Sequence, residues 1–261
     1  YKGDIYNITT RNGRNIRVTP VHPLIRISDN GVEKIRAQDL QKGESVAICK
    51  NLELSSSLTI PEVSMEAFEA VDGGMVRSKR TYHNPKAITT PKVVDSKLVR
   101  FVAYTITESN HTKGKIVFSN KDKDLLKDFT MLSGSLFNLQ PTARKREDKS
   151  AYELDLSSVS LIEFLENNLG LAPALSGDKK IPASFMGMPK SMTAELLQVL
   201  FDCEGSVEHS RIVRGKEIEY SSKSKVLVEQ VQLLLNRFGI VGKINRKPVK
   251  GKDYWRLIIS G

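Results

Sequence analysis

The sequence has 261 residues, of which 39% are hydrophobic, and its formal net charge is +10. This length allows one or two domains, and no apolar run approaches the ~20 residues of a membrane-spanning helix. Two cysteines cannot form a disulfide framework, and the start of the chain lacks a secretory signal, so we expect a cytoplasmic (intracellular) protein. The positive excess favours a polyanionic partner, most often nucleic acid, although a generally basic protein has the same charge.

The first 50 residues alternate short apolar stretches with turn signals, which indicates a meander of short strands. Residues 37–50 indicate one turn of helix, a Lys-Gly turn and a closing strand. Thr19 and His22 lie in the segment VTPVHPL, between two expected strands. Histidine can donate a proton near neutral pH, so His22 is a candidate acid, with a buried turn histidine as the alternative.

Residues 51–95 carry weaker signals. The segment 65–71, MEAFEAV, fits one short helix, and its surroundings are rich in Ser, Gly, Pro and basic residues. Residues 53–95 are therefore expected to form a linker. A DNA-contacting arm is the alternative, because basic residues lie next to Tyr82 and His83. No spaced Cys or His residues accompany these positions, so a zinc site is not indicated.

Two apolar stretches, residues 98–108 and 194–204, each predict a helix buried on most of its sides. Glu204 lies in the last turn of the second helix, and Gly205 is a candidate C-terminal cap. Helix C-termini carry partial negative charge, so an acid there indicates a nearby cation, with a solvated acid as the alternative. An offset of 96 residues places Glu108 on Glu204.

The chain beyond each helix repeats as well. Residues 118–129 align with residues 220–231 at an offset of 102, and residues 151–158 align with residues 254–261 at an offset of 103. One structural unit used twice predicts a pseudo-twofold α+β domain in which the two apolar helices pack together. That packing would bring the two acids to one end of the helix pair.

The stretches LQVLFDCEG (197–205) and FVAYTITES (101–109) resemble the motif of LAGLIDADG homing endonucleases, specifically the dodecapeptide type carried inside inteins. The resemblance covers residues 96–261, as repeat one, 96–190, and an incomplete repeat two, 191–261. It implies an αββαββα endonuclease domain whose sheets straddle double-stranded DNA. It also implies a monomer that acts on a long asymmetric target site.

The implied reaction is hydrolysis of phosphodiester bonds in both DNA strands. Glu108 and Glu204 would be catalytic and would hold Mg²⁺ or Mn²⁺ through oxygen ligands. The block DKKIPASF implies an active-site lysine at Lys180, with Lys179 as an uncertain neighbour and an exposed surface lysine as the alternative. Basic residues on the expected hairpins would bind DNA: Arg144, Lys145, Arg146, Lys243, Arg246, Lys247, Lys250 and Lys252.

Residues 1–52 resemble the N-terminal half of a Hint domain, the protein-splicing domain of inteins. The resemblance implies that His22 protonates the scissile amide nitrogen while Thr19 orients it. A splicing intein begins with Cys or Ser and ends in Asn, whereas this chain begins at Tyr1 and ends at Gly261. We therefore expect an interior piece of a longer intein that does not splice by itself. Two alternatives remain: a DNA- or RNA-binding LAGLIDADG protein without cleavage activity, and a splicing module with an inactive nuclease passenger.

Overall fold

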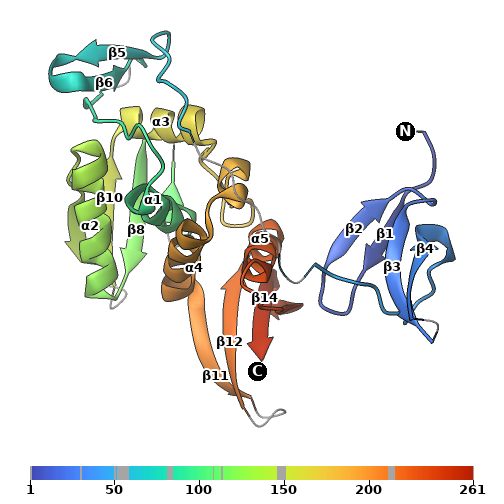
Figure 1. Ribbon diagram of the computed structural model, residues 1–261. Helices are drawn as coiled ribbons and strands as arrows, with labels where there is room; N and C mark the ends of the chain where they lie inside the picture. The colour runs from blue at the N-terminus through green and yellow to red at the C-terminus, as the bar shows by residue number, and fades with distance from the viewer. Residues whose placement is uncertain are drawn as a thin grey trace.

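The computed structural model describes residues 2–29, 31–49, 51, 59–80, 85–107, 109–112, 114–145, 151–210 and 215–260. They form a small N-terminal β unit, a separate hairpin, and two α+β halves, each built on a four-stranded sheet (Figure 1). Within these residues, none of the helices has the length and apolar character needed to cross a bilayer.

The N-terminal unit consists of two antiparallel hairpins, in agreement with the predicted meander. Strand β1 (Tyr6–Thr9) pairs with β2 (Asn15–Val18), and β3 (Pro23–Ser28) pairs with β4 (Gly31–Arg36). The expected helical turn is the 3-10 helix η1 (Ala37–Asp39).

A hairpin also occupies part of the expected linker. Strand β5 (Phe68–Val71) pairs with β6 (Met75–Ser78) across the short 3-10 turn η2 (Asp72–Gly74). The prediction of a helix at residues 65–71 is therefore wrong. Two consecutive glycines with positive φ form the turn, and the fully buried Phe68 fixes the strand against the core, so long-range pairing outweighs local helix propensity.

The first α+β half begins with helix α1 and ends with helix α3. Its four strands form an antiparallel sheet in the order β7-β8-β10-β9. Asp95, Asp122 and Ser158 cap the three helices, because each side chain accepts a hydrogen bond from a backbone N–H of the first turn. The elements are α1 (Ser96–Ile106), β7 (Ser109–His111), β8 (Lys115–Asn120), α2 (Lys123–Phe137), β9 (Thr142–Lys145), β10 (Tyr152–Ser157) and α3 (Val159–Leu169).

The second half repeats the order of helix, two strands, helix and two strands. Its antiparallel sheet has the order β11-β12-β14-β13, which is equivalent to that of the first sheet. A 3-10 helix, η3 (Ala183–Gly187), precedes it. The elements are α4 (Lys190–Glu204), β11 (Gly205–Ser210), β12 (Gly215–Ser222), α5 (Lys225–Asn236), β13 (Lys243–Val249) and β14 (Lys252–Ser260).

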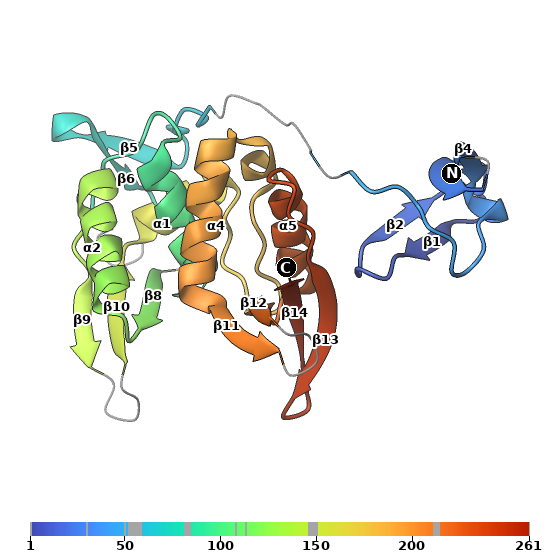
Figure 2. The ribbon, with the colours of Figure 1, turned by 60° about the horizontal axis from the view of Figure 1, so that its bottom comes forward.

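Helices α1 and α4 lie side by side at the centre of the two halves, as predicted (Figures 1 and 2). Ala103 of α1 and Val199 of α4 are completely buried. Gly205 ends α4, but with an extended backbone rather than a left-handed one. A Cβ there would lie 2.4 Å from the Phe201 carbonyl oxygen, so glycine permits the direct passage from helix into strand.

The N-terminal unit contacts the second half through the turn of its first hairpin. The backbone N–H of Ile244 donates to the carbonyl of Asn12 at 3.0 Å, and the Gln232 amide donates to the same oxygen at 2.9 Å. Gly13 has a φ of +82°, and a Cβ there would lie 2.8 Å from the Ile244 Cβ. The turn therefore fits against β13 because it carries a glycine.

Candidate active site

A cavity of about 500 Å³ lies where the C-terminal ends of α1 and α4 meet. Thr107 and Ser109 line it from the end of α1, and Glu204 lines it from the end of α4. Glu108 itself lies outside the described residues, between these two neighbours in sequence. The structure thus brings the two predicted helix ends to one cavity.

Two lysines accompany Glu204 at this cavity. Burial raises the pKa of the Tyr220 hydroxyl well above its usual value, and the charge of the neighbouring Glu204 carboxylate raises it further. Lys179 and Lys223 line the same cavity, and the Lys223 ammonium lies 5.5 Å from the centre of the Tyr254 ring. The acid at the end of α4 therefore has cations nearby, as the helix dipole argument predicted.

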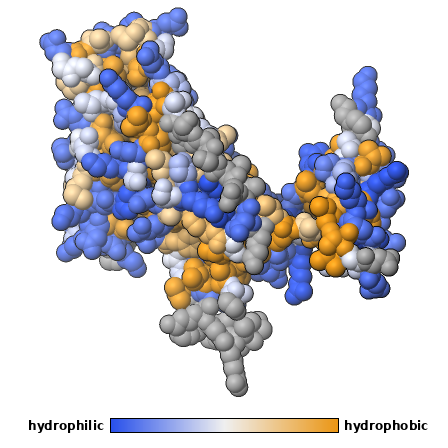
Figure 3. All heavy atoms as spheres, viewed as in Figure 1, coloured by the Kyte–Doolittle hydropathy of each residue, from blue (hydrophilic) through white to orange (hydrophobic). Residues whose placement is uncertain are grey.

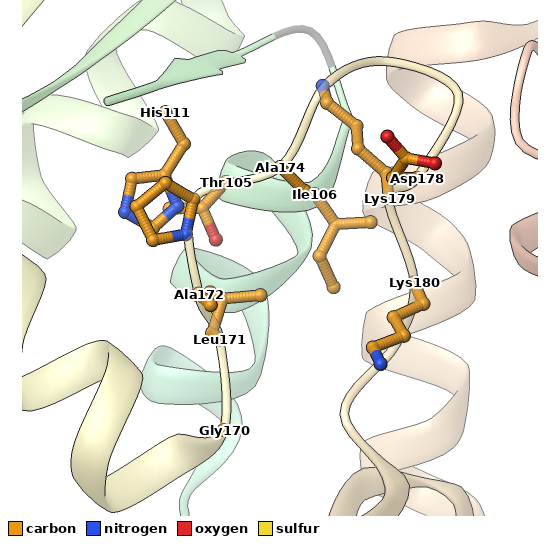
Figure 4. Close-up of a pocket in the computed structure, with 11 residues that line it drawn as sticks. Thr105, Ile106, His111, Gly170, Leu171, Ala172, Ala174, Asp178, Lys179 and Lys180 are labelled. Carbon is orange, nitrogen blue, oxygen red and sulfur yellow. The ribbon is translucent and has the colours of Figure 1, made fainter. Parts of the chain in front are cut away.

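The two adjacent lysines of the DKKIPASF block take different places. Lys179 donates hydrogen bonds to the backbone carbonyls of Ser109, at 2.8 Å, and of Thr107. Lys180 borders only a second pocket of about 290 Å³, and its side chain points the opposite way (Figure 4). Among the described residues, the structure thus places Lys179 rather than Lys180 beside Glu204, which the sequence spacing alone did not distinguish.

His111 lines the second pocket and is a site residue that the sequence analysis did not select (Figure 4). Burial, and then the charge of Lys179, lower its pKa to about 4. Its Nε2 is buried and has no hydrogen-bond partner among the described residues. The imidazole is therefore neutral at physiological pH.

The cavity offers the oxygen donors that a hard divalent cation requires. Among the described residues, no three His, Cys, Asp or Glu side chains are grouped to hold a metal ion. However, Mg²⁺ typically uses one or two protein carboxylates and completes its shell with water and phosphate oxygens. The Glu204 carboxylate at the cavity fits that mode of binding.

The strand register sorts the predicted DNA-binding residues by sheet face. Side chains alternate along a strand, and the buried Ile244 and Leu257 mark the face that packs on the helices. The opposite face, called the open face below, carries the residues out of phase with this core. Arg144, Lys243, Lys247 and Lys252 lie on the open faces by this alternation.

The other predicted basic residues lie elsewhere. Lys145 is opposite Tyr152 and Arg246 is opposite Trp255, both in phase with the core, and Arg246 pairs with Asp253 at 2.8 Å. Lys250 lies in the β13–β14 turn, and Arg146 lies outside the described residues. The open faces also carry Lys115 and Arg256, which the same period-two alternation identifies in retrospect.

The two predicted splicing residues share one turn of the N-terminal unit. The His22 N–H donates to the Thr19 carbonyl at 3.1 Å, and the His22 carbonyl accepts from Ala37 at 2.9 Å. The His22 residue is exposed, so it is not the buried turn histidine considered as an alternative.

Comparison with known proteins supports the resemblance in the second half. Residues 191–261 match the profile of the LAGLIDADG-like domain. The chain is 28% identical over its full length to one protein of the A-type ATP synthase of Pyrococcus abyssi, and it covers 24% of that relative. It is 26% identical, over 70% of its length, to the glutamine–fructose-6-phosphate aminotransferase of Methanocaldococcus jannaschii, of which it covers 16%.

A third relative is the replication factor C small subunit of Thermococcus kodakarensis, at 27% identity over 98% of this chain and 24% of that protein. The chain thus spans a quarter or less of the length of these three relatives. A solved structure of mesophilic variants of the homing endonuclease I-DmoI aligns with 63% of this chain and 88% of that chain, at 19% identity and a TM-score of 0.46.

Proposed function

We propose that this chain is part of an intein-encoded homing endonuclease that cleaves both strands of DNA by metal-dependent hydrolysis. The observation that carries the proposal is the cavity at the joined ends of α1 and α4, which Glu204 and Lys179 line together. The LAGLIDADG-like match over residues 191–261 supports it, because this range begins inside α4.

The residues at the cavity have complementary roles. Glu204, with Glu108 as its counterpart in the repeat, supplies carboxylate oxygens for a divalent cation. Such a cation, when bound, neutralises phosphate charge and lowers the pKa of coordinated water. Lys179, held at the end of α1 by the Ser109 carbonyl, places a positive charge where charge develops on the scissile phosphate.

The open faces of the two sheets form the expected DNA-binding surface. Their cations lie on both sides of the helix pair, which suits a duplex that crosses the cavity between them. A net charge of +10 favours phosphate binding, and binding should weaken steeply as salt displaces it. We further propose a long asymmetric target site and a monomeric enzyme, because two non-identical halves provide both surfaces.

The N-terminal unit fits the proposed splicing part. Apolar side chains gather on its surface, among them Ile25 at 48%, Ile27 at 70% and Val32 at 75% exposure (Figure 3). Exposed apolar area of this kind favours a unit completed by further chain. The curated relatives carry unrelated names and each matches over a quarter or less of its length, which supports a segment inserted into different host proteins.

The test is cleavage by the intact protein of a plasmid library that carries randomised inserts, with Mg²⁺ present. We expect wild-type protein to linearise a subset of the plasmids and Glu204→Gln to linearise none. Lys179→Met should slow cleavage by roughly 10²–10³-fold, as loss of one charge-stabilising donor typically does. Lys180→Met is the matched control, since this lysine borders only the other pocket, and it should cut near the wild-type rate.

A different outcome would select another function. If Glu204→Gln cut both strands at the wild-type rate, the metal site at the end of α4 would be wrong. If wild-type protein bound duplex DNA but never cut it, the non-cleaving DNA-binding alternative would replace the nuclease.

A further inference from the structure

Each sheet carries one buried carboxylate on its open face. Asp155 in β10 lies between Leu154 and Leu156, which point into the core, so its own side chain points away from the helices. Glu219 in β12 likewise precedes the fully buried Tyr220. Both carboxylate side chains are only 8% exposed. A buried charge of this kind requires partners.

Asp155 receives three polar contacts. The Lys115 ammonium lies 2.7 Å from its Oδ2, and the Arg144 guanidinium lies 2.6 Å from the same oxygen. The Ser157 hydroxyl donates to Oδ1 at 2.6 Å. The two cations come from the other central strand, β8, and from the edge strand, β9.

Glu219 receives an equivalent set of contacts. The Arg256 guanidinium lies 2.9 Å from Oε2, and the Lys247 ammonium lies 3.7 Å from Oε1. The Ser221 hydroxyl donates to Oε1 at 2.6 Å. Here too one cation comes from the other central strand, β14, and one from the edge strand, β13.

The two clusters are alike in arrangement but not in sequence position. The acid lies on β10 in the first sheet and on β12 in the second, and β12 is the counterpart of β8 rather than of β10. In each sheet the acid faces an aliphatic residue across the central strand pair, Val117 or Ile258. Simple retention of an acid after duplication does not produce this exchange of strands, so the cluster was built separately in each half.

We propose that Asp155 and Glu219 are positioning residues for nucleic-acid recognition, an inference that rests on the proposed function. Each carboxylate holds two cationic side chains in place on the open face and neutralises part of their charge. Fixed guanidinium and ammonium groups can read the donor and acceptor pattern of base edges in the major groove. Unrestrained ones bind any phosphate backbone. The acids therefore increase sequence discrimination and reduce indiscriminate binding.

The test compares Asp155→Asn and Glu219→Gln with wild type in the intact protein. One probe is a duplex of scrambled sequence, bound over a series of salt concentrations. The other is a randomised duplex pool, sequenced after rounds of binding. Both variants should bind the scrambled duplex more tightly at low salt, with a log–log salt slope steeper by about one to two, since each additional neutralised phosphate contributes ~0.9. Both should enrich sequences less sharply.

Glu217→Gln is the matched control. Glu217 lies two residues before Glu219 on the same strand and face, and within the described residues no ion pair is assigned to it. Its substitution adds the same charge without releasing a cation, so it should leave the slope and the enrichment unchanged. Arg144→Gln, at a side chain 63% exposed, does not threaten folding and should reduce enrichment with little change in slope.

The outcomes separate the two proposals. Wild-type protein that binds neither probe would contradict the proposed function, and this inference with it. Wild-type protein that binds and enriches, while the acid variants match it or Glu217→Gln reproduces their effects, would overturn the inference alone. Melting temperatures identify a variant that fails to fold, and Arg144→Gln then carries the test, because unchanged enrichment in that variant also overturns the inference.

Discussion

Acidification should destabilise the protein through His111. The side chain is 7% exposed, and burial followed by the charge of Lys179 lowers its pKa from 6.5 to about 4. The unfolded chain, in which the imidazole has its ordinary pKa, therefore binds the proton more readily than the folded chain. The contribution to stability is fully present above pH 6.5 and is lost as the pH falls toward 4.

The size of the effect follows from the difference between the two pKa values. One pKa unit corresponds to about 1.4 kcal/mol, so the whole window is worth about 3 kcal/mol, of which about 2 kcal/mol is lost at pH 5. This is a large share of the typical stability of a domain, which is about 5–15 kcal/mol. The loss should therefore appear clearly in an unfolding transition.

Urea unfolding at about pH 8 and pH 5 measures the effect in wild type and in His111→Leu. The variant removes the titrating group, and no hydrogen bond to the buried Nε2 is lost among the described residues. Wild type should lose about 2 kcal/mol more than the variant on acidification. His22→Gln, at an exposed histidine, is the control and should behave like wild type. Equal losses in wild type and His111→Leu would refute the reasoning.

Two further substitutions test the packing around the site. Gly13→Ala should speed hydrogen exchange at the Ile244 amide, because a Cβ would lie 2.8 Å from the Ile244 Cβ. Gly31→Ala, which has a φ of +98° but open space around it, should not, and equal exchange in the two variants would contradict the docking of the turn. Asp128→Ala removes the acceptor that Arg100 contacts at 2.8 Å, and should lower the free energy of unfolding by about 2 kcal/mol. A change within about 0.5 kcal/mol in urea unfolding would show that this pair is dispensable.

Local patterns in the sequence were sufficient to predict the helix pair. The apolar runs of α1 and α4 and their repeated neighbours depend on residue periodicity, which is visible without any long-range contact. The repeat then related Glu108 to Glu204, and the structure joins the ends of the two helices at one cavity. The hairpin at residues 68–78 was not predictable in this way, because its strands are stabilised by the buried Phe68 rather than by local propensity.

The sequence by itself determined that a basic α+β chain carries two equivalent buried helices, each followed by an acid or ending in one. Only the tertiary structure decided which of two adjacent lysines reaches Glu204, since neighbouring residues in an extended segment point in opposite directions. It alone also decided that Asp155 and Glu219 each join cations from two other strands. Such partners are distant in sequence and become neighbours only through strand register, which no local pattern encodes.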